Sequence, residues 1–153
     1  MLSWNQLQKE ETTFNMVNAI LLRIQLSGRI DRLTDESVNL IQTGIQYYKE
    51  TRSDRRGAIP FWPLGFSRYC ENWAVLGLVG NERIYLAVWR RKGSDNSMKI
   101  PLNIIKGENI FRKCSYPSDS DTDAVWDECL GIFQLMLPNA PCVRIFEFWE
   151  EGR

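Results

Sequence analysis

Histidine is absent from the 153 residues of this chain. Imidazole supplies the base of Ser-His-Asp and Cys-His nucleophile systems, the ligands of HExxH zinc sites and much of the acid–base catalysis near neutral pH. The absence of histidine therefore excludes these chemistries for the chain itself. Carboxylates, lysines, tyrosines and cysteines are the groups that remain for catalysis.

An excess of charge is also lacking, because 19 basic residues balance 19 acidic residues. Without a positive field, neither nucleic acid nor an anionic membrane surface is an expected partner. No apolar run approaches the roughly 18 residues of a membrane span, and the N-terminus lacks the basic and apolar regions of a signal peptide. We therefore expect a soluble, cytoplasmic protein, and the length of the chain suits one domain.

Cysteine is scarce, and the four cysteines form no CxxC pair. That spacing disfavours a zinc site, and a neutral chain without a signal peptide disfavours a disulfide framework. We expect ordinary buried thiols in a reducing compartment, and no cofactor. The four residues are Cys70, Cys114, Cys129 and Cys142.

The first 57 residues carry the periodicity of two helices. Apolar residues three and four positions apart predict a first helix from about Leu7 to Leu26, and Gly28 supplies the residue at which such a helix stops. Thr34 is a good N-cap for a second helix that runs to about Thr51. The short connection favours two antiparallel neighbours. The predicted buried stripes are Phe14, Val17, Leu21 and Ile24 on the first helix and Val38, Ile41, Ile45 and Tyr48 on the second.

Apolar residues also lie outside these stripes, which implies that a further surface covers the helices. The junction, residues 58–72, strengthens this expectation, because its sequence IPFWPLG is too apolar for a solvent loop and too rich in proline for a helix or a central strand. We expect the junction to lie against a surface, since the chain alone would expose a large apolar patch. The residues outside the stripes are Met16, Ile20, Leu22, Leu40 and Tyr47.

Residues 73–153 predict an antiparallel β-rich unit. The segments Trp73–Leu78 and Arg83–Arg90 consist mainly of residues that favour strands and flank a Gly-Asn turn, so they predict a hairpin. Apolar residues fall on both faces of the second strand, which favours a two-layer sandwich over a sheet with one face in water. Further short strands are predicted in MKIPL, NIFRKCSY, AVWDECLGIFQLML and CVRIFEFW.

The predicted fold class is therefore α+β, with two antiparallel helices followed by an antiparallel β-sandwich. The segments are a helical part at 1–57, the apolar junction at 58–72 and the sandwich at 73–153. Arg144 and Glu147 interrupt the apolar last strand, and such charges are typical of an edge that must not pair with other chains.

Alternating aspartates suggest calcium at first sight. Asp119, Asp121 and Asp123 are spaced as at the start of an EF-hand loop. The rest of that loop is missing, because Ala124 stands where glycine is needed and Leu130 where the bidentate glutamate is needed. A solvated acidic loop without a metal is the expected structure.

Two other groups of residues could carry chemistry. Asp127 and Glu128 are adjacent carboxylates, but neighbouring strand residues point to opposite faces, so we expect them in a hairpin turn before Gly131. Four tryptophans could form a platform for pyranose rings, although core packing explains them better. We assign no catalytic, cofactor-binding or metal-binding residue. The tryptophans are Trp62, Trp73, Trp89 and Trp126.

Several motifs resemble one enzyme family. IPFWPLG, then W-x-x-LGL, then YLAVWRR are similar to the junction between the catalytic barrel and the C-terminal β-domain of melibiase-type alpha-galactosidases, the clan D glycoside hydrolases of the family 36 kind. The segments ETTFNMVNAILLRIQLSGRI and TDESVNLIQTGIQYYKETRSD resemble the last helices around that barrel. The closing RIFEF segment resembles the final strand, so the resemblance covers nearly the whole chain.

The resemblance implies the C-terminal part of such a hydrolase, with the last barrel helices followed by a sandwich that packs on a catalytic (β/α)8 barrel, in cis or in trans. The family's retaining enzymes use two aspartates about 5 Å apart. These lie on earlier barrel strands, and no aspartate here matches either position. The resemblance thus implies a structural role, no activity for this chain alone, and a galactoside-containing carbohydrate as a further partner.

Two other functions stay open from the residues. A stand-alone carbohydrate-binding or protein-interaction module would present exposed, coplanar tryptophan rings on one face of the sandwich. A separate subunit that completes a barrel encoded elsewhere would use the apolar face of the junction and the helices. The exposure of the tryptophan rings and of the junction distinguishes these functions from simple core packing.

Overall fold

The computed structural model of the protein describes residues 4–26, 30–118 and 122–150. In this part of the chain two helices precede eight strands. The helices are α1 (Trp4–Leu21) and α2 (Asp35–Arg55), and single 3-10 turns lie at Ile30–Arg32 and Asn103–Ile105. The strands are β1 (Ile59–Phe61), β2 (Trp73–Val79), β3 (Ile84–Arg90), β4 (Ser97–Pro101), β5 (Ile110–Tyr116), β6 (Ala124–Asp127), β7 (Ile132–Met136) and β8 (Cys142–Glu150).

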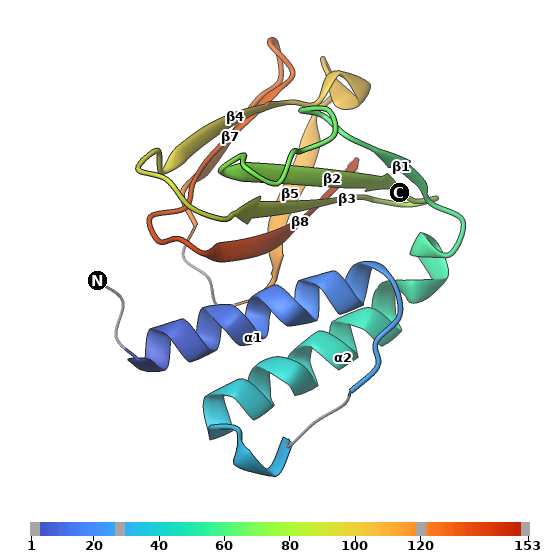
Figure 1. Ribbon diagram of the computed structural model, residues 1–153. Coiled ribbons are helices and arrows are strands. Elements are labelled where there is room, and N and C mark those ends of the chain that lie inside the picture. The colour runs from blue at the N-terminus through green and yellow to red at the C-terminus, as the bar shows by residue number, and fades with distance from the viewer. Residues whose placement is uncertain (1–3, 27–29, 119–121, 151–153) are drawn as a thin grey trace.

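The strands form two antiparallel sheets. One has five strands in the order β1-β2-β3-β8-β5, and the other has three in the order β4-β7-β6. Figure 1 shows α1 and α2 on one side of the larger sheet and β4 and β7 on the other. The α+β class and the β-sandwich predicted from the sequence are therefore confirmed.

The five-stranded sheet is covered on both faces, and this explains the apolar residues on both sides of its strands. On β3, Leu86 and Val88 belong to the core between the two sheets, whereas Ala87 belongs to the core between the sheet and the helices. On β8, Phe146 lies in the first core and Ile145 in the second. Successive strand residues point to opposite faces, so an apolar run without alternation is what such a central layer needs.

The predicted hairpins are present. β2 pairs with β3 along its whole length, from Trp73 opposite Arg90 to Val79 opposite Ile84. The segment AVWDECLGIFQLML forms β6 and β7, joined by a turn that ends at Gly131 with a positive φ of 68°. Such a φ favours glycine because it has no Cβ to clash.

The two helices agree with the sequence in number and differ in their ends. Thr34 caps α2 as predicted, since its hydroxyl accepts a hydrogen bond from the Ser37 N–H at 3.2 Å. α2 continues to Arg55, beyond the predicted end near Thr51. α1 ends at Leu21, about a turn before the predicted Leu26, and the predicted stop at Gly28 lies outside the described residues.

The most deeply buried helical residues are mostly those outside the predicted stripes. Met16, Ile20, Leu40 and Tyr47 are each at most 9% exposed, and three of them pack against the five-stranded sheet. In the predicted stripes Val17 is fully buried, whereas the other members are only half-buried. The further surface that covers these residues is therefore the chain's own sheet, whereas Leu22, which was expected to be covered as well, is 82% exposed.

The junction is only partly packed. Its first residues form β1, an edge strand paired with β2, which is where proline is tolerated. The Phe61 ring lies over Gly77, where an added Cβ would come within 2.1 Å of it. The rest of the junction extends into solvent, so the expectation that it lies against a surface is not met within this chain.

Two smaller expectations are wrong. β8 is a central strand between β3 and β5, so Arg144 and Glu147 do not protect an edge; each instead forms an ion pair. The cysteines are not all buried thiols: Cys70 and Cys129 are exposed because they lie in turns, and Cys142 is the one that is fully buried.

Candidate functional site

The junction exposes five large apolar side chains, which we call the junction surface. Tyr69 is 96% exposed and Phe66 is 79% exposed. The rings of Trp62 and Phe66 contact each other, with centroids 4.5 Å apart. In Figure 1 this green segment runs back from β1 to the start of β2, on the side of β2 away from the helices. The junction surface consists of Ile59, Trp62, Leu64, Phe66 and Tyr69.

The four tryptophans do not form one platform. Trp73 is 7% exposed and belongs to the core between the sheets. Trp89 packs against the core on the helix side, and its Nε1 donates to Asn18 Oδ1 at 3.2 Å. Trp126 packs on the other side of the larger sheet, edge-on to Phe148. Their distribution favours core packing over a shared sugar-stacking face.

The structure describes the acidic motifs only in part. Asp119 and Asp121 lie outside the described residues, and Asp123 is exposed. Asp127 accepts a hydrogen bond from the Leu130 N–H at 2.9 Å, which stabilises the β6–β7 turn as expected. Among residues 4–26, 30–118 and 122–150, no group of three side chains could hold a metal ion, and no helix is long and apolar enough to cross a membrane.

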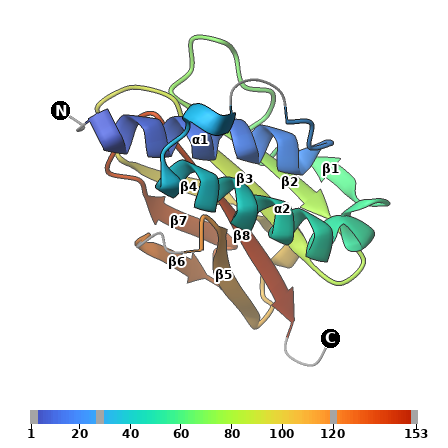
Figure 2. The same cartoon turned by 90° about the horizontal axis from the view of Figure 1, so that it is seen from below.

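A polar cleft of 590 Å³ lies between α2 and the helix-facing side of the larger sheet. Figure 2, from the helix side, shows β8 and β5 extending past α2. The cleft opens where the helical layer leaves these strands uncovered. One face of α2 forms its wall, because residues three and four positions apart share a helix face. This wall contains Thr43, Gln46, Tyr47, Glu50, Thr51 and Asp54.

A cross-strand row of polar side chains forms the floor of the cleft. Tyr85 on β3 is opposite Glu147 on β8, and Glu147 is opposite Lys113 on β5. Directly opposite residues in antiparallel strands share a sheet face, so these three side chains lie side by side. Trp149 follows two residues after Glu147 and therefore lies on the same face.

Glu147 is the buried charge of this floor, at 3% exposed. Its Oε2 is 2.5 Å from Nη1 of Arg83, and this hydrogen bond raises the pKa of the Arg83 guanidinium. The Tyr47 hydroxyl is buried without a hydrogen bond of good geometry. Burial, followed by the Glu147 carboxylate, raises the pKa of Tyr47. An unpaired buried hydroxyl costs about 1–3 kcal/mol, so the floor has unused hydrogen-bonding capacity.

Asp54 has a structural task at the rim of the cleft. Its Oδ1 accepts from the N–H groups of Asn81 and Glu82, at 2.7 and 3.0 Å, and its Oδ2 accepts from the Tyr85 hydroxyl at 2.8 Å. A Cβ at Gly80 would lie 2.4 Å from this carboxylate, which explains the glycine. Asp54 thus fixes the end of α2 to the β2–β3 turn.

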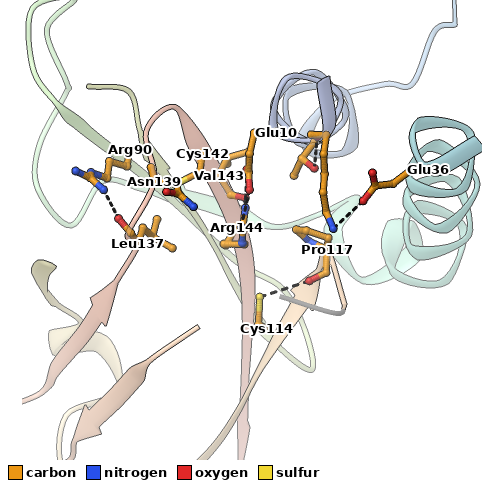
Figure 3. Close-up of polar contacts among 12 residues, drawn as sticks. Glu10, Glu36, Arg90, Cys114, Pro117, Leu137, Asn139, Cys142, Val143 and Arg144 are labelled. Carbon is orange, nitrogen blue, oxygen red and sulfur yellow. Dashed lines mark hydrogen bonds and ion pairs between the residues drawn. The ribbon is translucent and has the colours of Figure 1, made fainter. Parts of the chain in front are cut away.

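A second buried ion pair holds α1 on the sheet. Arg144 donates from Nη1 and Nη2 to the two oxygens of Glu10, at 3.0 and 2.9 Å (Figure 3). Burial is the largest single effect and acts to lower the pKa of Arg144, but the hydrogen bonds to Glu10 and the charge of Glu10 act together against it, and the net pKa is raised. In the same region the buried Cys142 thiol donates to the Asn139 carbonyl at 2.7 Å, and burial raises its pKa from 9.0 to about 11.

The sequence did not reveal the cleft. Its floor combines residues from three strands, and Arg83, just before β3, pairs with Glu147, which follows 64 positions later. Two features of the sequence indicate polar positions on this face. Lys113 and Ser115 are two positions apart on β5, and Glu147 interrupts the apolar last strand. Only the pairing of β3, β8 and β5 brings these positions together.

Comparisons with known proteins show similarity at the level of the fold. The sequence matches no model of a protein family and no curated protein. A solved structure with a similar fold is a putative alpha-N-acetylgalactosaminidase from Bacillus halodurans C-125, with a TM-score of 0.59 and 10% sequence identity. The similarity covers 95% of this chain and 31% of that one. The chain therefore shares its helix-and-sandwich fold with under a third of a longer, glycosidase-like protein.

Proposed function

We propose that this chain is the C-terminal β-domain of a glycoside hydrolase of the alpha-galactosidase kind, with a structural role against a catalytic barrel. The observation that carries the proposal is the similarity of nearly the whole chain to part of a longer putative glycosidase. The junction motifs IPFWPLG and YLAVWRR, which resemble the barrel-to-sandwich boundary of melibiases, point to the same family.

The junction surface is the part of this chain that would contact the barrel. Phe66 and Tyr69 are both more than three-quarters exposed, and exposed apolar patches of this kind mark protein–protein interfaces. The helices do not require a barrel for their buried faces, because the larger sheet covers them. The contact is therefore centred on the junction and forms in cis or in trans.

Under this proposal the barrel supplies the chemistry. Retaining glycosidases place two carboxylates about 5 Å apart at the sugar. The buried carboxylates in the described part of the chain are paired with arginine, Glu10 with Arg144 and Glu147 with Arg83. Carboxylates held in ion pairs are poorly suited to act as nucleophile and acid, so the isolated chain is inactive under the proposal.

Co-purification tests the proposed contact. The tagged chain is co-expressed with the catalytic barrel domain of a glycoside hydrolase of the alpha-galactosidase kind, and complex formation is followed by size-exclusion chromatography. Tyr69→Asp places a charge in the junction surface and is expected to weaken the complex at least about tenfold, since a buried unpaired charge is costly. Leu130→Asp is the matched control, because Leu130 is 59% exposed on the distant β6–β7 turn.

An activity assay completes this test. The isolated chain is expected to show no turnover of aryl alpha-galactosides or aryl alpha-N-acetylgalactosaminides, and the complex is expected to hydrolyse one of them. Turnover by the highly purified chain alone would contradict the structural role. A complex that tolerates Tyr69→Asp as well as Leu130→Asp would contradict the assigned interface.

A further inference from the structure

The cleft between α2 and the sheet has polar groups that the fold leaves unsatisfied. The Tyr47 side chain is 9% exposed and lines the cleft; its hydroxyl lies near the Glu147 carboxylate but makes no hydrogen bond of good geometry. Ser115 lines the same cleft, and its buried hydroxyl lacks a partner. Buried polar groups in native proteins are normally hydrogen-bonded. Two such groups beneath one cavity indicate that a ligand completes the network.

The charges around the cleft argue against an anionic ligand. The lining contains four carboxylates and two basic side chains, and one of the two, Arg83, is already paired with Glu147. This balance repels phosphates and carboxylates. The acidic side chains are Glu50, Asp54, Glu82 and Glu147, and the basic ones are Arg83 and Lys113.

The same residues argue against a cationic ligand. Asp54 is saturated by two backbone N–H groups and the Tyr85 hydroxyl. Glu50 accepts from the Gln46 amide at 2.6 Å, and Lys113 stands directly opposite Glu147 on the floor. The floor carboxylate, Glu147, already has Arg83 as its basic partner, and the described residues offer no cluster for a metal ion.

A neutral ligand that carries hydroxyl groups fits the polar lining of the cleft without adding a charge. Each hydroxyl both donates and accepts, so it can pair with Lys113 as a donor and with carboxylate and hydroxyl oxygens as acceptors. The 590 Å³ volume is within the range of small-ligand sites, about 300–1,000 Å³. The Trp149 side chain adds an apolar edge beside the polar row.

We propose that this cleft binds a neutral polyhydroxylated ligand, a mono- or disaccharide, between the α2 wall and the row formed by Tyr85, Glu147 and Lys113. The ligand's hydroxyls contact the floor, and a small adjustment of the side chains brings the Tyr47 hydroxyl into the network. The lining of the cleft includes no member of the junction surface, and the inference does not depend on the proposed role of that surface.

Titration of the full chain tests the site. Backbone amide resonances are followed by NMR while methyl glycosides of galactose and glucose, lactose and maltose are added. Saturable shift changes confined to α2, the β2–β3 turn and start of β3, β5 and the end of β8 are expected with at least one sugar. Inorganic phosphate and tetramethylammonium serve as anionic and cationic probes and are expected to cause none. No saturable change with any sugar, changes on β4, β7 and β6 instead, or equal binding of the ionic probes would overturn the proposal.

Variants then identify the contacts. Tyr47→Phe removes only the Tyr47 hydroxyl, and Lys113→Ala removes an exposed donor; each is expected to weaken sugar binding by about tenfold, as for the loss of one good hydrogen bond. Lys99→Ala is the matched control, since Lys99 is an exposed lysine on β4 in the other sheet. The melting temperature of Tyr47→Phe is expected to stay unchanged or rise. Unchanged sugar affinity in both cleft variants would overturn the assignment.

Discussion

At the scale of single residues, buried charges connect the helical layer to the sheet. Glu10 and Arg144 form a two-point ion pair whose side chains are 10% and 14% exposed. Removing one member of such a pair leaves the other charge buried without a partner, and this is far more costly than losing a surface pair. The neighbouring pair of Lys9 and Glu36, in which both side chains are more than 40% exposed, offers a direct comparison.

We therefore expect Glu10→Ala to lower the free energy of unfolding by about 3 kcal/mol or more. Lys9→Ala, one residue away on the same helix, is expected to lower it by less than about 1 kcal/mol, because its ion pair is in water. Urea denaturation followed by circular dichroism measures both values. Equal losses in the two variants would show that the buried pair has no special role.

Burial of the Cys142 thiol makes stability depend on alkaline pH. Its pKa is raised from 9.0 to about 11, so the unfolded chain loses the thiol proton at a lower pH than the folded chain does. Below pH 9 both states keep the proton and the stability is fully present. As the pH rises from 9 to 11, the unfolded state alone ionises and the stability is lost, by roughly 3 kcal/mol over this range.

Comparison with Cys142→Ala tests this pH effect. Unfolding is measured in denaturant at steps between pH 8 and 11, and the stability of the wild-type chain is expected to fall more steeply than that of the variant. Buried tyrosines contribute equally to both, so the difference between the curves isolates the thiol. If the stability of both proteins fell equally with pH, the Cys142 thiol would not be the cause of the loss.

At the scale of elements, α2 approaches its neighbours most closely at Gly44. A Cβ there would lie 2.7 Å from the end of Met16 and 3.2 Å from the Tyr116 ring. The Tyr116 hydroxyl donates to the Leu40 carbonyl at 2.9 Å, so this ring is held in place and cannot move away easily. The glycine therefore serves close packing between α1, α2 and β5.

Gly44→Val is expected to lower the free energy of unfolding by about 1–3 kcal/mol, as overpacking of a tight contact does. Gly57→Val is the control, because an added Cβ at Gly57 meets nothing within 4 Å and its effect should stay within about 0.5 kcal/mol. Thermal denaturation compares the two. A neutral Gly44→Val would show that α2 can shift away from the sheet.

Local sequence patterns predicted which helices and strands form, but they predicted less well which face of each helix is buried. Thr34 was recognisable as an N-cap because capping depends on residues only three positions apart. The turn before Gly131 was recognisable from the glycine itself, because glycine is favoured where φ is positive, as it is at Gly131. The buried side of α1 could not be recognised in this way. Met16 and Ile20 are apolar like their neighbours, and only the position of the sheet makes them face the core.

At the scale of the whole molecule, the larger sheet is the middle layer of three. The helices cover one of its faces and β4, β7 and β6 cover the other. Without the helices, Ala87, Tyr116, Val143 and Ile145 would face water. We therefore expect the sandwich to need the helical segment in order to stay soluble.

Deletion of residues 1–57 is therefore expected to yield a chain that aggregates, whereas the full chain should unfold in a single cooperative transition. Light scattering during refolding and the coincidence of far-ultraviolet and tryptophan signals measure the two properties. A soluble monomeric deletion variant with the β-sheet spectrum of the parent would show that the helices and the sandwich are independent units.

The sequence by itself determined the class of the fold, the two helices, most of the strands and the exclusion of histidine-based chemistry, because composition, periodicity and caps act over a few residues. Only the tertiary structure decided three things: that the helices pack on the chain's own sheet, that β8 is central, and that Tyr47, Lys113 and Glu147 meet in one cleft. These depend on strand order and on contacts between residues up to 134 positions apart, as in the pair Glu10 and Arg144. No local pattern records such long-range pairings, since their free energy comes from burial that exists only in the folded chain.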